Sequence, residues 1–77
     1  MVLSDLKAGQ SAYILGLTDA GALAKRLLDM GFTPGTPFTV RTCAPGGDPM
    51  LIELRFSAVI LRKEEAACVL VTQPKTL

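Results

Sequence analysis

The sequence predicts a mainly β fold: a small barrel of about five antiparallel strands with one α-helix inserted after the first strand. Three observations lead to this fold class. Short segments of alternating apolar and polar residues recur along the chain, turn signals rich in glycine and proline separate them, and only one segment repeats its apolar residues at helical spacing. Closing short strands into a barrel removes edges that an open five-stranded sheet would expose.

Length and composition predict one small domain. The chain has 77 residues, 49% of them hydrophobic, and a mean hydropathy of +0.40. We expect a single domain over residues 1–77, with residues 72–77 as a loose C-terminal tail. A domain of this size buries only about 60% of the surface that its unfolded chain exposes. Large apolar side chains left on its surface are therefore informative.

Charge and cysteine content exclude some classes of partner and location. Eight Lys and Arg oppose seven Asp and Glu, and aromatic residues make up 5% without any Trp, so we expect no nucleic-acid partner. No apolar run approaches the length of a membrane span, and no signal peptide is recognisable at the start, so the expected location is cytoplasmic. Cys43 and Cys68 are expected as reduced thiols, with a single bridge between them left open.

The first strand and the helix are read from the N-terminal half. After a turn in which Ser4 can act as a cap and Gly9 is left-handed, "SAYILGL" predicts a strand over residues 11–17. Leu23, Leu27 and Met30 then recur at i, i+4 and i+7, which predicts a helix of about three turns. Thr18 or Asp19 can cap it.

The junction "LLDMGFTPGTP" predicts a helix end followed at once by a turn. Gly31 occupies the position where a helix C-terminus favours a left-handed residue, and Phe32 can fold back onto Leu27 as in a Schellman motif. Pro34 and Gly35 then satisfy the two central positions of a type II turn.

The C-terminal half predicts a hairpin and two further short strands. Residues 37–44 and 50–56 alternate as strands joined by the Gly-containing loop 45–49, in which Pro49 makes Asp48 extended. Residues 58–71 give two apolar runs separated by a one-turn 3₁₀ link at residues 62–65. One face of the hairpin is expected to hold Phe38, Val40, Thr42 and Ala44 from its first strand, and Met50, Ile52, Leu54 and Phe56 from its second.

Catalytic and metal-binding residues are scarce. The chain has no His, neither Cys has an adjacent base, and the carboxylates form no acid–base motif, so no enzyme and no catalytic residue is expected. The glycine-rich loop lacks the Gly-Lys-Ser/Thr ending of a phosphate-binding loop, which favours the hairpin interpretation. No Cys-x-x-Cys pair exists, and Glu64 and Glu65 fit a solvated turn better than a ligand pair. We expect no cofactor and no tight metal site, with weak transition-metal binding left open.

Three blocks of the sequence carry a family resemblance. "RLLDMGFTPGTPFTV", "APGGDPMLIEL" and "VILRKEEAACVLV" resemble successive blocks of the ferrous iron transport protein A (FeoA) family, and the resemblance extends from Leu6 to Val71. It implies an SH3-like barrel without catalytic activity, which supports ferrous iron uptake by acting on FeoB, a membrane transporter with a cytoplasmic G-protein domain. A similar domain in iron-dependent repressors implies the alternative of a metal-responsive regulatory module.

A partner surface is expected at the hairpin loop, because loops held by a rigid barrel are frequent recognition sites. In addition, Leu51, Cys68 and Leu70 are expected to point outward, where the helix, a second copy of the chain or another partner would cover them. Arg26 is a further candidate for a basic rim. The candidate partner-binding residues are Ala44, Pro45, Gly46, Gly47, Asp48, Pro49, Leu51, Arg41, Arg55, Arg62 and Lys63.

Overall fold

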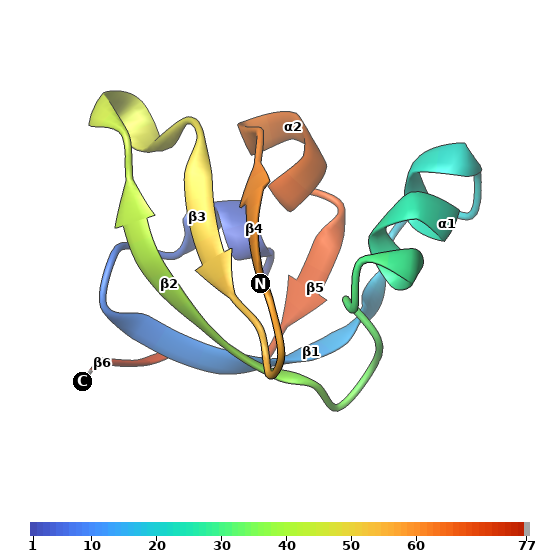
Figure 1. Cartoon of the computed structure of the whole chain (residues 1–77), viewed down its shortest axis with the longest axis horizontal. Helices are drawn as coiled ribbons and strands as arrows, with labels where there is room; N and C mark the ends of the chain where they lie inside the picture. Colours follow the sequence, from blue (N-terminus) through green and yellow to red (C-terminus); the bar gives the residue numbers. More distant parts are fainter. Residues whose placement is uncertain (77) are drawn as a thin grey trace.

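The computed structural model describes residues 1–76 and shows a strongly curved antiparallel sheet around one apolar core (Figure 1). Its elements are η1 (Leu3–Asp5), β1 (Gln10–Leu17), α1 (Ala22–Asp29), β2 (Pro37–Cys43), η2 (Pro45–Gly47), β3 (Met50–Glu53), β4 (Ala58–Leu61), α2 (Lys63–Ala66), β5 (Val69–Val71) and β6 (Lys75–Thr76). The prediction of five main antiparallel strands with a helix after the first is confirmed.

Strand β1 joins the two halves of the sheet. Its first half pairs with β2 through residues 11–13, and its second half pairs with β5, with Leu17 opposite Val69. The register shifts between Ile14 and Gly16, which bends β1 from one half to the other. The strand order is β4-β3-β2-β1-β5, and within residues 1–76 the outermost strands β4 and β5 do not pair with each other. The hydrogen-bonded cylinder is therefore incomplete on one side.

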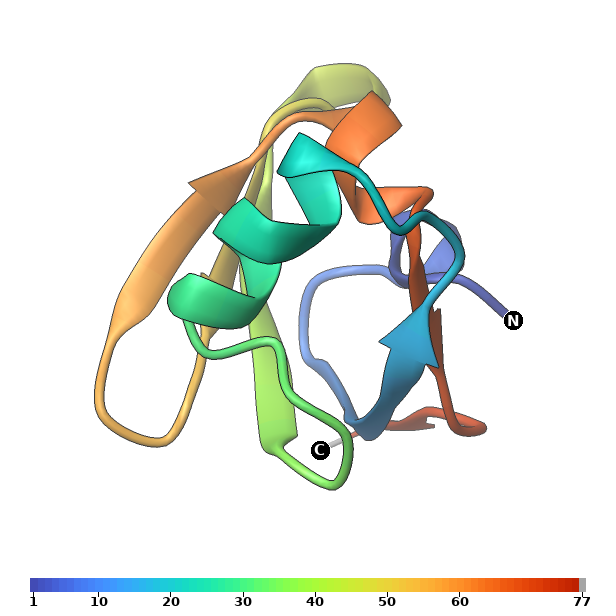
Figure 2. The same cartoon turned by 90° about the vertical axis from the view of Figure 1, so that its right-hand side faces the viewer.

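Helix α1 covers this open side. Figure 2 shows α1 lying across the space between β4 on the left and the β1–β5 pair on the right. Leu27 is completely buried in the core, while Leu23 and Met30 pack against it from its margin. The core cluster comprises Leu3, Leu6, Ala12, Ile14, Leu27, Phe32, Phe38, Val40, Met50, Ile52, Leu54, Leu61, Ala66, Val69 and Val71.

The start of α1 differs from the expectation. The helix has eight residues, about two turns, and its N-cap is Gly21. The predicted caps lie further upstream, where the Asp19 carboxylate accepts hydrogen bonds from the N–H groups of Ala20 (2.8 Å) and Gly21 (3.3 Å). Asp19 thus fixes the turn that leads into the helix. Ser4 likewise lies inside η1, where Val2 holds the N-cap position.

The C-terminus of α1 is fixed by a pair of backbone hydrogen bonds. The N–H of Phe32 donates to the carbonyl of Leu27, and that of Gly31 donates to Leu28, both at 3.0 Å. Gly31 has φ of 110°, and Phe32 is completely buried. This is a Schellman motif, so the helix end holds the aromatic ring in the core.

The next turn attaches this junction to β1. The N–H of Thr36 donates to the carbonyl of Thr33 (3.1 Å) across Pro34 and Gly35. Gly35 has φ of 88°, and its N–H donates to the carbonyl of Ile14 at 2.7 Å. The turn therefore holds the start of β2 against the middle of β1.

Two residues of the hairpin, Thr42 and Phe56, do not share a face with their alternating neighbours as predicted. The register shifts at Arg41, because Val40 pairs with Ile52 and Thr42 pairs with Leu51. This bulge reverses the alternation, so Thr42 is exposed and Cys43 packs partly against the core.

Phe56 is the second error, since its side chain is 92% exposed. Strand β3 ends at Glu53, and the N–H of Leu54 donates to the carbonyl of Ser57 (2.7 Å). The chain therefore turns at residues 54–57, and the alternation that would have buried Phe56 stops before it.

The C-terminal segments also differ from the sequence prediction. The expected 3₁₀ link is the single α-turn α2, in which the N–H of Ala66 donates to the carbonyl of Arg62. Cys68 lies partly buried against the core before β5 begins, and Leu70 is half-buried in a bridge with Val2, so neither points freely outward.

The tail is paired with the sheet through residue 76. The N–H of Thr72 donates to the carbonyl of Tyr13 (3.0 Å), and β6 pairs with Gln10 and Ser11 of β1. The prediction of a loose tail over residues 72–77 is therefore wrong for residues 72–76, and residue 77 lies outside the described part.

We predict that Gly35→Ala destabilises the fold by about 1–2 kcal/mol, because a left-handed φ is unfavourable for a residue with a Cβ. Gly16→Ala is the matched control, since an added Cβ meets open space at both positions and only Gly35 has a positive φ. Urea unfolding of both variants measures the difference. Equal losses of stability in the two variants would contradict the assigned turn.

Candidate partner-binding surface

The loop between β2 and β3 is closed by its own backbone. The N–H of Ala44 donates to the carbonyl of Pro49 (3.0 Å), and the N–H of Gly47 donates to that of Ala44 (2.8 Å). Gly46 and Gly47 have φ of 83° and 81°, which suits glycine in so tight a loop. The result is a compact, partly exposed protrusion at one end of the sheet (Figure 1).

Asp48 attaches this loop to α2. Its carboxylate accepts a hydrogen bond from the N–H of Lys63 (3.1 Å), the first residue of α2, and lies 3.9 Å from the guanidinium of Arg62. A carboxylate at this position satisfies an N–H group that has no partner inside the helix. The loop, Arg62 and Lys63 are thereby brought together, as part of one surface.

A row of side chains, two of them apolar, continues this surface over the outer face of the sheet. Thr42, Leu51 and Ile60 are neighbours in register on β2, β3 and β4. Ile60 is 67% exposed, and Leu51 is half-buried beside it. Arg41 reaches Glu53 on β3, with 3.6 Å between the guanidinium and the carboxylate. We call the loop 44–49 together with Leu51, Ile60, Arg62 and Lys63 the loop surface.

Arg55 does not belong to the loop surface. It lies in the turn at residues 54–57, at the opposite end of the β3–β4 hairpin from the loop. There it borders two clefts, one of about 490 Å³ that Tyr13 and Phe38 also line, and one of about 560 Å³ beside Phe56. The predicted basic residues are therefore divided between two ends of the molecule.

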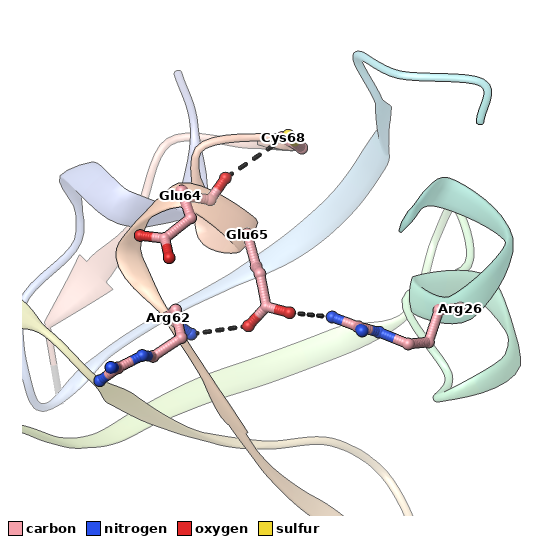
Figure 3. A network of polar contacts seen from close by, with 5 residues as sticks. All are labelled: Arg26, Arg62, Glu64, Glu65 and Cys68. Carbon is pink, nitrogen blue, oxygen red and sulfur yellow. Dashed lines mark hydrogen bonds and ion pairs between the residues drawn. The ribbon is translucent and has the colours of Figure 1, made fainter. Parts of the chain in front are cut away.

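Arg26 has a structural contact instead. Its guanidinium pairs with Glu65, whose other carboxylate oxygen accepts a hydrogen bond from the N–H of Arg62 at 2.8 Å (Figure 3). The Glu65 side chain is only 18% exposed. It therefore joins α1 to α2, and the prediction of a solvated turn is wrong for Glu65, while Glu64 is exposed as predicted.

One sequence signal for Glu65 was available. Glutamate three residues after an N-cap position is the spacing that lets its carboxylate reach the N-cap N–H group. The ion pair with Arg26 had no such signal, because the two residues are 39 positions apart. The exposure of Ile60 was also missed, since it lies within the uniformly apolar run "AVIL".

Metal ligands do not gather in the described part of the chain. Across residues 1–76, no three side chains of His, Cys, Asp or Glu lie close enough to hold an ion together. Both cysteines are free thiols and half-buried, and the Sγ of Cys68 donates to the carbonyl of Glu64 at 3.5 Å. None of the helices in residues 1–76 has the length and hydropathy needed to span a bilayer.

Comparison with known proteins assigns the chain to a family. The model of the FeoA domain matches residues 1–73. The chain belongs to the FeoA family. It is 42% identical over 67 residues to a Fe(2+) transport protein A/Fe(2+) transporter FeoB fusion protein of Porphyromonas gingivalis. The match covers 87% of this chain and 8% of the fusion protein, so the chain spans a small part of that relative.

Solved FeoA structures have the same fold. Iron(II) transport protein A of Clostridium thermocellum superposes with a TM-score of 0.85 at 38% identity, covering 92% of this chain and 44% of that one. The FeoA of Stenotrophomonas maltophilia, solved in complex with zinc and described as an SH3 domain protein, gives 0.84 at 34% identity, covering 94% and 89%. The predicted SH3-like fold is confirmed.

We predict that Glu65→Ala lowers the free energy of unfolding by about 1–2 kcal/mol, because it removes a hydrogen bond to the start of α2 and an ion pair to α1. Glu64→Ala is the matched control, since it removes the same charge from a neighbouring exposed side chain. Its expected effect is below about 0.5 kcal/mol. Thermal or urea unfolding that shows equal stability for both variants would refute the role assigned to Glu65.

Proposed function

We propose that the protein is a non-enzymatic accessory of ferrous iron uptake that docks on the cytoplasmic G-protein domain of a FeoB-type transporter. It acts from the cytosol, through contact rather than through chemistry. Family membership supports the role in iron transport, and the loop surface is the proposed docking site.

The fusion protein of Porphyromonas gingivalis is the observation that carries this proposal. A FeoA-like segment and a FeoB transporter share one polypeptide there. Linking two partners converts their encounter into an intramolecular event and raises their effective concentration. A fusion of this kind is useful when the two parts act on each other, which supports direct contact between the separate proteins as well.

The loop surface has the composition of a recognition site. Its loop is rigidly closed by backbone hydrogen bonds, so docking orders few additional residues. Ile60 and Leu51 supply an apolar centre, and Lys63 and Arg62 lie at its margin, an arrangement common at transient protein interfaces. Backbone carbonyl and N–H groups of the exposed loop add polar contacts.

We predict saturable binding of the transporter's isolated cytosolic domain to the isotope-labelled full chain, with amide shifts concentrated on residues 44–49 and on β3 and β4. Lys63→Glu is expected to weaken binding several-fold, because it reverses a charge at the margin of the loop surface. Lys25→Glu on α1 is the matched control and leaves the affinity unchanged.

The titration is performed with and without a guanine nucleotide on the transporter domain. Absence of saturable binding in both states would contradict direct docking. Saturable binding with amide shifts confined to α1 would support the proposed partner but contradict the loop surface as the binding site.

A further inference from the structure

Strand β4 ends the hydrogen-bonded sheet and is paired on one side only. Its partner is β3, with Met50 opposite Leu61 and Glu53 opposite Ala58. Figure 2 shows β4 at the left margin of the molecule. The other end of the sheet is covered, because Val2 forms a bridge with Leu70 and the N–H of Val71 donates to the carbonyl of Met1.

The alternation of an antiparallel ladder identifies the free backbone groups of β4. The N–H of Leu54 donates to the carbonyl of Ser57, so the backbone groups of Ser57 point toward β3. Every second residue along the strand points the same way, so the backbone groups of Val59 and Leu61 also point toward β3. On the other side of β3, the carbonyl of Pro49 accepts a hydrogen bond from the N–H of Ala44, which follows β2. Odd-numbered residues of β3 therefore point toward β2 and even-numbered ones toward β4, in agreement with this assignment. Ala58 and Ile60 therefore direct one N–H and one C=O each away from the sheet.

These four groups have no hydrogen-bond partner within the described residues. Throughout residues 1–76, the backbone of Ala58 and Ile60 makes no hydrogen bond outside the β3–β4 ladder. Exposed edge strands are usually protected by a charge, a proline, a bulge, or a helix or loop that covers them. Strand β4 reads Ala-Val-Ile-Leu, without a charge or proline, and its pairing with β3 has no bulge. Helix α1 lies across the neighbouring side of the barrel, but Ala58 and Ile60 remain exposed beside it, so the edge is accessible to another strand.

We propose that β4 accepts an extended segment of the docking partner as an added strand, hydrogen-bonded to Ala58 and Ile60. The inference rests on the proposed function and specifies how the partner engages the sheet. Backbone hydrogen bonds give such an added strand its affinity, and side chains beside Ile60 give it selectivity. The cleft of about 560 Å³ beside Ser57 and Phe56 adjoins the edge next to Ala58, with Arg55 and Asp29 in its lining.

Strand β4 is too short to form a complete interface by itself. Its four residues extend over only about 13 Å, whereas a stable interface buries about 800 Å² on each partner. A partner that binds the adjoining loop surface at the same time supplies the missing area. A second copy of the chain, paired through β4 alone, does not.

Charge also favours a foreign, acidic segment over a second copy. Residues 55–63 contain Arg55, Arg62 and Lys63 and no acid. Asp48 lies against Arg62, whereas Arg55 and Lys63 have no ion-pair partner in residues 1–76. Antiparallel pairing of two copies with Ala58 opposite Ile60 would bring Arg55 of each copy toward Lys63 of the other. The occupant is therefore an alternating apolar segment with acidic residues at its ends.

The test uses the full chain and the transporter's isolated cytosolic domain. Ala58→Pro removes a free-edge N–H at the first residue of β4, where proline is tolerated, and leaves the ladder with β3 intact. It is expected to raise the Kd about tenfold. Ala58→Thr retains the N–H and is expected to bind within about twofold of the wild type.

Amide hydrogen exchange on the wild type provides a readout independent of any variant. The amides of Ala58 and Ile60 are expected to exchange fast in the free chain and slowly in the complex, while Val59 and Leu61 are protected in both. Wild-type affinity of Ala58→Pro, with unprotected Ala58 and Ile60 amides in the complex, would overturn the added strand and leave the proposed docking in place.

Two other outcomes overturn the inference differently. Absence of any binding by the wild type removes the proposed function and the added strand together. A free chain that sediments as a dimer, with Ala58 and Ile60 amides already protected, would identify a second copy as the occupant of β4.

Discussion

The structure depends on the burial of Phe32 and Leu27 across the side of the barrel where the sheet does not close. Both side chains are completely buried. Leu27 lies in the last turn of α1, and Phe32 follows shortly after the helix ends. Since β4 and β5 share no ladder in residues 1–76, apolar contact replaces the hydrogen bonds that would complete the cylinder. In so small a domain few other side chains can supply that seal.

Several local features are arranged so that α1 stays on the open side. The Schellman hydrogen bonds to Leu27 and Leu28 fix the direction in which Phe32 leaves the helix. The turn at Gly35 holds the following strand against Ile14, and Glu65 attaches α1 to α2 at the other side. Sealing the barrel with a helix leaves the backbone of β4 unpaired, so the same constraint that completes the core creates the free edge.

The order of the elements could be predicted from the sequence because their signals are local. Glycine and proline at positions 31, 34 and 35 mark the helix end and the turn, and alternation marks each strand. The bulge at Arg41 and the early end of β3 depend on how neighbouring strands pair, so the facing of Thr42 and Phe56 was predicted wrongly. The predicted partner-binding residues do not form one cluster: the loop meets Arg62 and Lys63 through Asp48, but Arg55 lies at the far end, because their separation depends on how the strands pair.

The most direct test of the central constraint compares two phenylalanines of this chain by urea unfolding. Phe32→Ala removes the completely buried ring and is expected to cost about 3–5 kcal/mol, a large share of the roughly 5–15 kcal/mol that stabilises a typical domain. Phe56→Ala removes the 92% exposed ring and is expected to cost less than about 0.5 kcal/mol. Similar stabilities of the two variants would contradict the view that Phe32 seals the open side of the barrel.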